Sequence, residues 1–246
     1  VILSNFAHHL EKIIDQTAFK HVIITDIGDM LGGLKGSIVN FVVKKIKKMV
    51  PPFRIDNYIK FNDALKAGAS LEFKEVEITN DDTAFLQYTG GTTGVSKGAR
   101  LTNRNLVATM LQIAEWKKPL LVEREETIIT ALPLYHIFAL TVNCLAMLNI
   151  GAKNILVTNP RDMKAFIKDL KKYPFSIFTG VNTLFNGLMN QDEFKNVDFK
   201  SLKVTIAGGM ALQDAVAIRW KEVTGCNLLE GYGLTESSPV LTCNPV

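Results

Sequence analysis

From Thr83 onward the sequence alternates between short apolar runs and longer segments with helical periodicity, and this alternation strongly limits the fold. Several of the apolar runs lack interleaved polar residues, which is typical of parallel strands that helices cover on both faces. The pattern predicts an α/β fold, doubly wound, with mostly parallel sheets. The expected strands are 84–88, 127–132, 154–157, 176–179, 203–207 and 228–230, and the expected helices are 103–117, 138–148, 162–172, 183–190 and 212–223.

The first 80 residues are organised differently. Strands expected at 1–4 and 21–25 flank a helix expected at 6–17, which predicts a βαβ unit. Residues 28–80 contain several glycines, two prolines and few strand signals, so we expect an insertion or a connection between two sheets. The predicted domains are therefore a partial α/β subdomain at 1–80 and a ligand-binding α/β subdomain at 81–246. Because the chain begins at Val1 rather than Met, we expect a piece of a longer protein.

A basic segment lies between Lys35 and Lys60, which contains seven basic residues and one acidic residue. Apolar residues recur there at helical spacing from Leu34 to Met49, which predicts a basic amphipathic helix. A packed surface helix with a solvated lysine face is the first interpretation. Association with an anionic membrane surface is the second. Nucleic-acid binding is disfavoured, because no stacking aromatic residues or nucleic-acid motif accompany the lysines.

The scattered cysteines Cys144, Cys226 and Cys243 form no metal-binding spacing and no disulfide framework. They indicate a reducing compartment, and no signal peptide or apolar run of membrane-spanning length is visible. We expect a cytoplasmic protein, with peripheral contact at the inner face of the membrane left open.

A glycine-rich loop at 87–98 follows the first strand of the alternating region. Its glycines permit tight turns, and its backbone N–H groups, hydroxyls and Lys97 ammonium suit phosphate oxygens. The spacing of a Walker A loop is absent. A phosphate cradle between a strand and a helix is the favoured interpretation, and a hairpin or linker is the alternative.

Three further loops follow expected strands, at the edge where parallel sheets bind ligands. The first places His136 between aromatic residues, where it either packs or contacts a substrate. The second has the pair Gly208 and Gly209, which allows a flat ligand close to the backbone or makes a simple turn. The third offers the Tyr232 ring for stacking, the Thr235 hydroxyl for a phosphate and the Glu236 carboxylate for Mg²⁺. Together these loops indicate a nucleotide-triphosphate enzyme with an apolar co-substrate.

Residues 88–98 resemble the signature of adenylate-forming enzymes, the superfamily of acyl-CoA synthetases, and residues 132–136 and 231–236 resemble two further motifs of that superfamily in order and spacing. Residues 1–5, 159–162 and 180–184 are similar to bacterial long-chain fatty acid–CoA ligases, so the resemblance covers the whole chain. Departures are minor: Gly90 stands where many relatives have serine, and Ser96 where many have proline or alanine.

The resemblance implies a role for each motif residue. The residues that would hold the β- and γ-phosphates of ATP are Thr89, Gly90, Gly91, Thr92, Thr93, Gly94 and Lys97. Those that would line the adenine site are Gly208, Gly209, Glu230, Gly231 and Tyr232. Thr235 would meet the α-phosphate, Glu236 would bind Mg²⁺, and His136 would lie at the carboxylate end of an acyl tunnel. The implied catalytic residues are Thr235, Glu236, His136 and Lys97.

The implied reaction has two steps. A fatty carboxylate reacts with ATP to give acyl-AMP and pyrophosphate, and the thiol of CoA, the co-substrate, then takes the acyl group. The family's later aspartate, hinge and lysine lie beyond Val246, so we expect the chain alone to be inactive. An acyl-AMP ligase that serves a carrier protein and a non-catalytic binding module are the alternatives. Homodimerisation, acyl chain length and membrane contact stay open.

Overall fold

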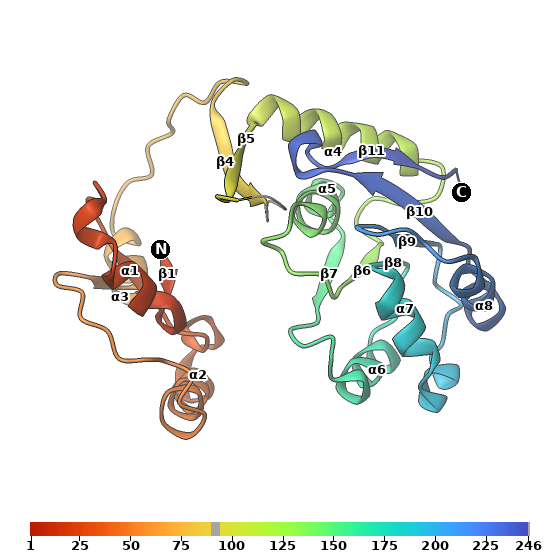
Figure 1. The fold of residues 1–246 in the computed structure, drawn as a ribbon, viewed down its shortest axis with the longest axis horizontal. Coiled ribbons are helices and arrows are strands. Elements are labelled where there is room, and N and C mark those ends of the chain that lie inside the picture. The colour runs from red at the N-terminus through yellow and green to blue at the C-terminus, as the bar shows by residue number, and fades with distance from the viewer. Residues whose placement is uncertain (90–93, 246) are drawn as a thin grey trace. The chain divides into compact units, whose positions relative to one another are not determined.

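The computed structural model describes residues 1–89 and 94–245 (Figure 1). The chain divides into two compact units, Val1–Val76 and Glu77–Val246, called unit 1 and unit 2 below. The predicted class is confirmed, because both units combine parallel strands with helices. In the described part of the chain, no helix has the length and apolar character needed to cross a membrane.

Unit 2 is built on a six-stranded sheet with the strand order β11-β10-β9-β8-β6-β7. Five strands are parallel and β11 runs antiparallel to β10. The chain places β7 on one side of β6 and β8 on the other, so the winding direction reverses between β6 and β8. The strands are β6 (Thr127–Thr130), β7 (Lys153–Leu156), β8 (Ile177–Gly180), β9 (Val204–Ala207), β10 (Leu228–Gly233) and β11 (Val240–Cys243).

Helices cover both faces of this sheet, and alternate residues of a strand belong to different cores. In β8, Ile177 packs with residues of α4 and α5, whereas Phe178 packs with residues of α6, α7 and α8. This alternation explains why the strand sequences are almost entirely apolar. The helices are α4 (Asn103–Lys117), α5 (Ala146–Asn149), α6 (Met163–Lys172), α7 (Asn182–Met189) and α8 (Asp214–Thr224), and a π-helical segment, Ala139–Leu145, precedes α5.

Trp220 of α8 is at the centre of the larger core. It is fully buried, and its ring lies 4.7 Å from that of Phe185 and 5.8 Å from that of Phe178, centroid to centroid. Its Nε1 donates a hydrogen bond of 3.1 Å to Thr205 Oγ1 in β9, so the polar edge of the indole is satisfied. One side chain thus ties α7, α8, β8 and β9 together and fixes the ends of the strands that carry the loops.

The hairpin of β4 (Thr83–Thr89) and β5 (Lys97–Thr102) is the main departure from the expected topology of unit 2. The glycine-rich loop was expected to lead from a strand into a helix, but it joins two antiparallel strands. Strand β5 was missed because its sequence has only two residues, Ala99 and Leu101, that contact the core. Pairing with β4 stabilises it, and α4 begins directly afterwards with a capping box formed by Thr102 and Asn105.

Unit 1 contains a three-stranded parallel sheet of β1 (Ile2–Leu3), β2 (Ile23–Thr25) and β3 (Ile59–Lys60) in that order. The βαβ start is confirmed. The expected helix at 6–17 is wrong as one element, because it is divided into a 3-10 turn, α1 (Ala7–Glu11) and a second 3-10 turn. Residues 28–80 are more than a connection, since β3 joins the first sheet. They also form α2 (Gly33–Phe41), a π-helical turn at Val42–Ile46 and α3 (Phe61–Gly68).

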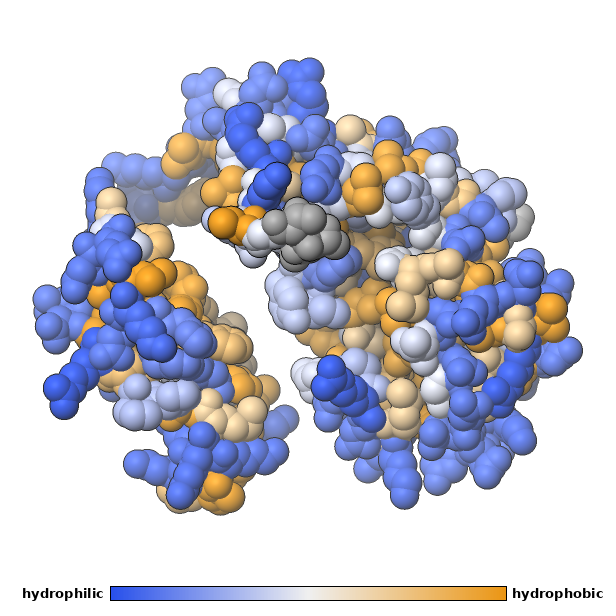
Figure 2. All heavy atoms as spheres, in the orientation of Figure 1, coloured by the Kyte–Doolittle hydropathy of each residue, from blue (hydrophilic) through white to orange (hydrophobic). Residues whose placement is uncertain are grey.

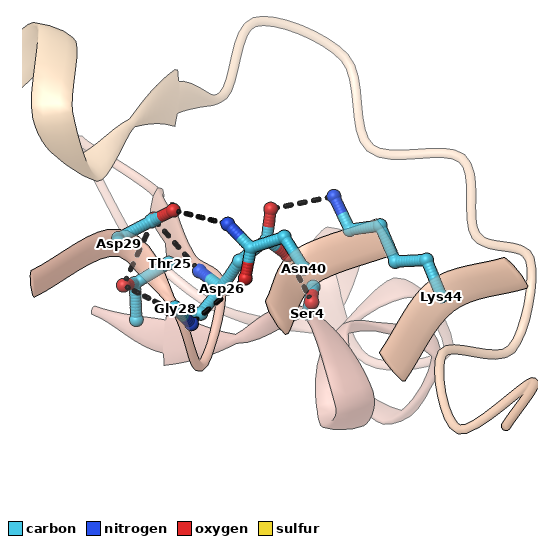
Figure 3. Close-up of polar contacts among 7 residues, drawn as sticks. All are labelled: Ser4, Thr25, Asp26, Gly28, Asp29, Asn40 and Lys44. Atoms are coloured by element: carbon cyan, nitrogen blue, oxygen red, sulfur yellow. Dashed lines mark hydrogen bonds and ion pairs between the residues drawn. The ribbon is translucent and has the colours of Figure 1, made fainter. Parts of the chain in front are cut away.

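A polar cluster fixes α2 to the end of β2 (Figure 3). Asn40 accepts a hydrogen bond of 2.7 Å from the Gly28 N–H and donates one of 3.0 Å to Asp29. Asp26 accepts from Ser4 and pairs with Lys44, each at 2.5 Å. These contacts hold the polar side of the helix, and the apolar side chains of Leu34, Ile38 and Phe41 stay exposed.

Candidate functional site

A cavity of about 980 Å³ lies in unit 2, at the carboxyl edge of the parallel sheet. Its walls come from the end of β4, the loop before the π-helical segment, one side of α4, the ends of β9 and β10, and strand β11. The loop at 131–138 follows β6, which lies beside the point where the winding reverses. A doubly wound sheet binds its ligands at this point, because the loops of neighbouring strands diverge there.

Most of the described residues in the predicted motifs meet at this cavity. Those that line it are Thr89, His136, Gly208, Gly209, Gly231, Tyr232, Thr235 and Glu236. Gly94, Lys97 and Glu230 do not line it. Gly90, Gly91, Thr92 and Thr93 lie outside the described residues. The arrangement brings the predicted residues together, and their binding roles stay predictions.

His136 is exposed at the mouth of the loop after β6, and its ring orientation is defined by the backbone. Its Nδ1 accepts a hydrogen bond of 3.2 Å from the Phe138 N–H. Because Nδ1 is the acceptor, the proton of a neutral ring is placed on Nε2, which is then a donor available to a ligand. Gln87 of β4 donates to the Tyr135 carbonyl at 2.8 Å and ties the hairpin to this loop.

Gly208 and Gly209 form the wall opposite Phe138. A Cβ at Gly208 would lie 2.9 Å from the Phe138 ring, closer than side-chain contacts allow. Gly209 has φ of +80°, a region that side chains disfavour. Both glycines line the cavity, and the expectation that they allow a flat ligand close to the backbone stays a prediction.

Glu230 supports the site from behind. Its Oε1 accepts a hydrogen bond of 2.8 Å from the Leu212 N–H, so it holds the segment that follows Gly208 and Gly209. A glutamate in an adenine wall was expected to line the cavity directly. The structure instead shows a contact that positions the glycine turn.

The turn between β10 and β11 carries Thr235 and Glu236. The Leu234 N–H donates to the Pro239 carbonyl at 3.0 Å, and Ser237 contacts Leu234 and closes the turn. Glu236 is exposed to the cavity and forms no ion pair with another described residue. Its carboxylate is therefore available to a cation. In the described chain, no group of three or more metal-binding side chains is found.

Lys97 begins β5, and its side chain is exposed outside the cavity. Its carbonyl accepts a hydrogen bond of 3.4 Å from Thr89 Oγ1 across the hairpin. Thr89 itself lines the cavity. The hairpin therefore places Thr89, at one end of the glycine-rich loop, at the cavity, whereas Lys97 does not line it.

Lys117 is a site residue that the sequence analysis missed. It is 2% exposed, lines the cavity, and its Nζ contacts no hydrogen-bond partner among the described residues. Burial lowers its pKa from 10.5 to about 8, and the neighbouring Cys243 thiol opposes this shift. The signal was present in the sequence. Leu106, Thr109, Ile113 and Lys117 follow helical spacing on the buried side of α4, so a lysine occupies a core position.

The doubly wound sheet, with a glycine-walled cavity at its winding reversal, places the chain in the class of α/β proteins whose ligand sites lie at the carboxyl ends of the strands. The profile of a family described as "AMP-binding enzyme" matches residues 4–246. The chain belongs to this family.

Curated relatives match the whole chain. It is 54% identical over 245 residues to a long-chain-fatty-acid–CoA ligase of Escherichia coli O6:H1, and this alignment covers 100% of the chain and 44% of the relative. It is 51% identical over 249 residues to a long-chain-fatty-acid–CoA ligase of Haemophilus influenzae, with the same coverage. The chain thus spans less than half of the length of these relatives.

Solved structures share the fold. An anthranilate CoA ligase in complex with anthranoyl-AMP matches with a TM-score of 0.74 and 20% identity, over 99% of this chain and 42% of that one. A long-chain-fatty-acid-CoA ligase from Archaeoglobus fulgidus matches with a TM-score of 0.68 and 22% identity, over 98% of this chain and 47% of that one.

Proposed function

We propose that the protein containing this chain is an AMP-forming long-chain fatty acid–CoA ligase. The observation that carries the proposal is the 54% identity, along the whole chain, to a relative of that name. A fatty carboxylate would react with ATP to give acyl-AMP and pyrophosphate. The CoA thiol would then attack the acyl carbonyl, and AMP would leave.

The cavity residues suit the first step, which requires positioning and charge neutralisation more than covalent chemistry. Nε2 of His136 can donate a hydrogen bond to the fatty carboxylate or to the mixed anhydride. The Thr235 hydroxyl would contact the α-phosphate. Tyr232, exposed at the cavity, offers a ring face to the adenine base, and the hairpin with Thr89 and Lys97 would hold the outer phosphates.

Glu236 fits a magnesium ion that arrives with the nucleotide. One unpaired carboxylate without further protein ligands is the usual provision for Mg²⁺, which takes its other ligands from substrate phosphates and water. When bound, the ion would neutralise phosphate charge. We expect Glu236→Gln to lower the rate of pyrophosphate release and to raise the Mg²⁺ concentration needed for half-maximal rate. Glu222→Gln on α8 is the matched control, because that glutamate is exposed and away from the cavity.

The experiment for the proposed function measures pyrophosphate release by a full-length protein that carries this chain. ATP, Mg²⁺ and fatty acids of increasing length are supplied with and without CoA. Release that depends on a long-chain acid, with acyl-CoA formed only when CoA is present, supports the ligase. Acyl-AMP that accumulates regardless of CoA would favour the alternative with a carrier-protein acceptor, and no acid-dependent release would leave a binding module. The 246-residue chain alone is expected to be inactive.

We also propose that the segment at 33–47, which comprises α2 and the π-helical turn after it, contacts an anionic membrane surface. Leu34, Ile38 and Phe41 are 77%, 54% and 59% exposed. Lys35, Lys45 and Lys47 are exposed as well, and no ion pair is found for them among the described residues. Figure 2 shows hydrophobic and hydrophilic residues together on the visible face of unit 1. Such a surface suits the boundary between headgroups and acyl chains.

Vesicle binding tests this surface. Full-length protein is expected to sediment with vesicles containing phosphatidylglycerol, less so at high salt, and not with pure phosphatidylcholine. Because each lysine near an anionic surface contributes about 1 kcal/mol, the double change Lys45→Ala with Lys47→Ala is expected to weaken binding roughly thirtyfold. Lys66→Ala with Lys74→Ala, two exposed lysines outside this segment, is the matched control. Equal losses for both pairs would contradict a role of the segment at 33–47. Sedimentation equilibrium of the same protein without vesicles measures whether it is a homodimer.

A further inference from the structure

None of the roles proposed above for the cavity residues uses the buried amine of Lys117. The side chain is 2% exposed and its Nζ lacks a hydrogen-bond partner in residues 1–89 and 94–245. A buried ammonium without a partner is costly, because water no longer solvates it. This free-energy cost indicates that a group other than these residues forms a hydrogen bond with the amine when the protein functions.

No carboxylate supplies this partner. The neighbouring titratable group is the Cys243 thiol of β11, and burial raises the pKa of that thiol, so at pH 7 it is neutral and supplies no negative charge to Lys117. On its own helix, Glu115 and Lys118 pair with each other at 3.1 Å. The other titratable side chains in the surrounding walls, none of them bonded to Nζ, are Glu123, Tyr88, Tyr135, Tyr232, His136 and Glu236.

Much of the wall beside Lys117 is apolar, although Thr109 and Gln112 of the same helix also line the cavity. In the cavity it lies in a wall with Ile113, Trp116 and Val142. Lys117 and Ile113 also border a smaller pocket of about 250 Å³, with Leu121, Met147 and Ile150 in its lining. An ammonium group beside a largely apolar wall suits a ligand that has an apolar body and one acidic group. It suits a sugar phosphate poorly.

We propose that Lys117 is an anion-binding residue of this cavity and that its ligand is a carboxylate of the acyl substrate. The proposal rests on the proposed function. The carboxylate is either the reacting group or a second acid group at the far end of the chain, and both would form the same charge-assisted hydrogen bond with Nζ. In either case Lys117 contributes to selection of the acid.

Direct binding tests the assignment without turnover. Decanoate, decanedioate and the uncharged 1-decanol are titrated, without ATP or CoA, into a full-length protein that carries this chain, and the heat of binding is measured. Lys117→Met is expected to weaken binding of the acids at least tenfold and to leave 1-decanol unchanged. Lys117→Arg is expected to retain most of the acid affinity. Lys118→Met, at the exposed neighbouring position, is the matched control.

The pattern of losses identifies the bound group. Weaker binding of both acids to Lys117→Met assigns Lys117 to the reacting carboxylate, and a loss for decanedioate alone assigns it to a distal one. Acid affinity of the unaltered chain should also decrease between pH 7 and pH 9, with a flat profile for Lys117→Met. Equal affinity of acid and alcohol, unchanged acid binding in a folded Lys117→Met, or no acid binding to the unaltered chain would overturn the proposal. A failed pyrophosphate assay would refute the ligase without changing these titrations.

Discussion

Replacement of Lys117 by methionine is expected to raise the free energy of unfolding by about 3 kcal/mol at pH 7. Burial lowers the lysine pKa from 10.5 to about 8, and each unit of pKa difference corresponds to about 1.4 kcal/mol. Below pH 8 the amine is protonated in the folded and in the unfolded protein. The folded protein is therefore destabilised by the full free energy of burying the charge. Methionine fills a similar space without a charge, and the cost disappears.

The pH dependence has a defined sign. Between pH 8 and pH 10.5 the folded state loses the proton while the unfolded chain keeps it, so the unaltered protein gains stability as the pH rises. Urea unfolding at several pH values should therefore show a difference between the two proteins that decreases from pH 8 upward and vanishes near pH 10.5. Lys118→Met, at an exposed position, is expected to differ little at any pH. A pH-independent difference for Lys117→Met would contradict the burial argument.

Gly233→Ala is expected to destabilise the protein by about 3 kcal/mol, near the upper end for overpacking. A Cβ at this position would lie 2.1 Å from the Pro239 carbonyl oxygen and 2.8 Å from its carbon. Both are backbone atoms that cannot rotate away, so β10 and β11 must separate. The turn with Thr235 and Glu236 would move with them, and displacement of about 1 Å can cost about a hundredfold in rate.

Urea unfolding and pyrophosphate release by the full-length protein measure the two effects of Gly233→Ala. Gly68→Ala is the matched control, because no atom lies within 4 Å of a Cβ at the end of α3 and its φ is not positive. That change is expected to be neutral or to stabilise the protein by about 0.4–1 kcal/mol through the unfolded state. Full activity of Gly233→Ala would show that the turn does not position the phosphate-binding residues.

The cost of Lys117 and its proposed role are two aspects of one feature. Buried charges that destabilise a fold are often found where function requires them. If a carboxylate neutralises the amine, ligand binding recovers part of the cost. Acid binding should then stabilise the unaltered protein against urea more than it stabilises Lys117→Met, at equal saturation.

The sequence predicted the parallel sheet because buried strands must be apolar on both faces, as Ile177 and Phe178 show by packing in different cores. Helix α4 was placed correctly because Thr102 and Asn105 form a local cap. Strand β5 was not predicted, because hydrogen bonds to β4 stabilise it although its own sequence has only a weak strand pattern. The helix expected at 6–17 failed because periodicity alone does not specify where a helix is interrupted.

Site residues that belong to a sequence motif could be predicted, whereas those that reach the site through tertiary contacts could not. His136, Gly208 and Thr235 meet at one cavity, as expected of loops that follow parallel strands. Glu230 has a supporting contact with Leu212 that no local pattern encodes. Lys117 required a comparison of its helical position with its charge, because a lysine on an amphipathic helix is usually assigned to solvent.

The cavity walls begin at Gln87 in β4 and end at Cys243 in β11, so the site is assembled from almost the whole length of unit 2. Contacts this distant in sequence form late in folding, because a long loop must close before they are made. During synthesis, a ribosome-bound chain has no complete pocket until β11 has emerged and paired with β10. A ligand of this cavity therefore cannot act as a template for early folding intermediates, and it can only stabilise unit 2 once the cavity has formed.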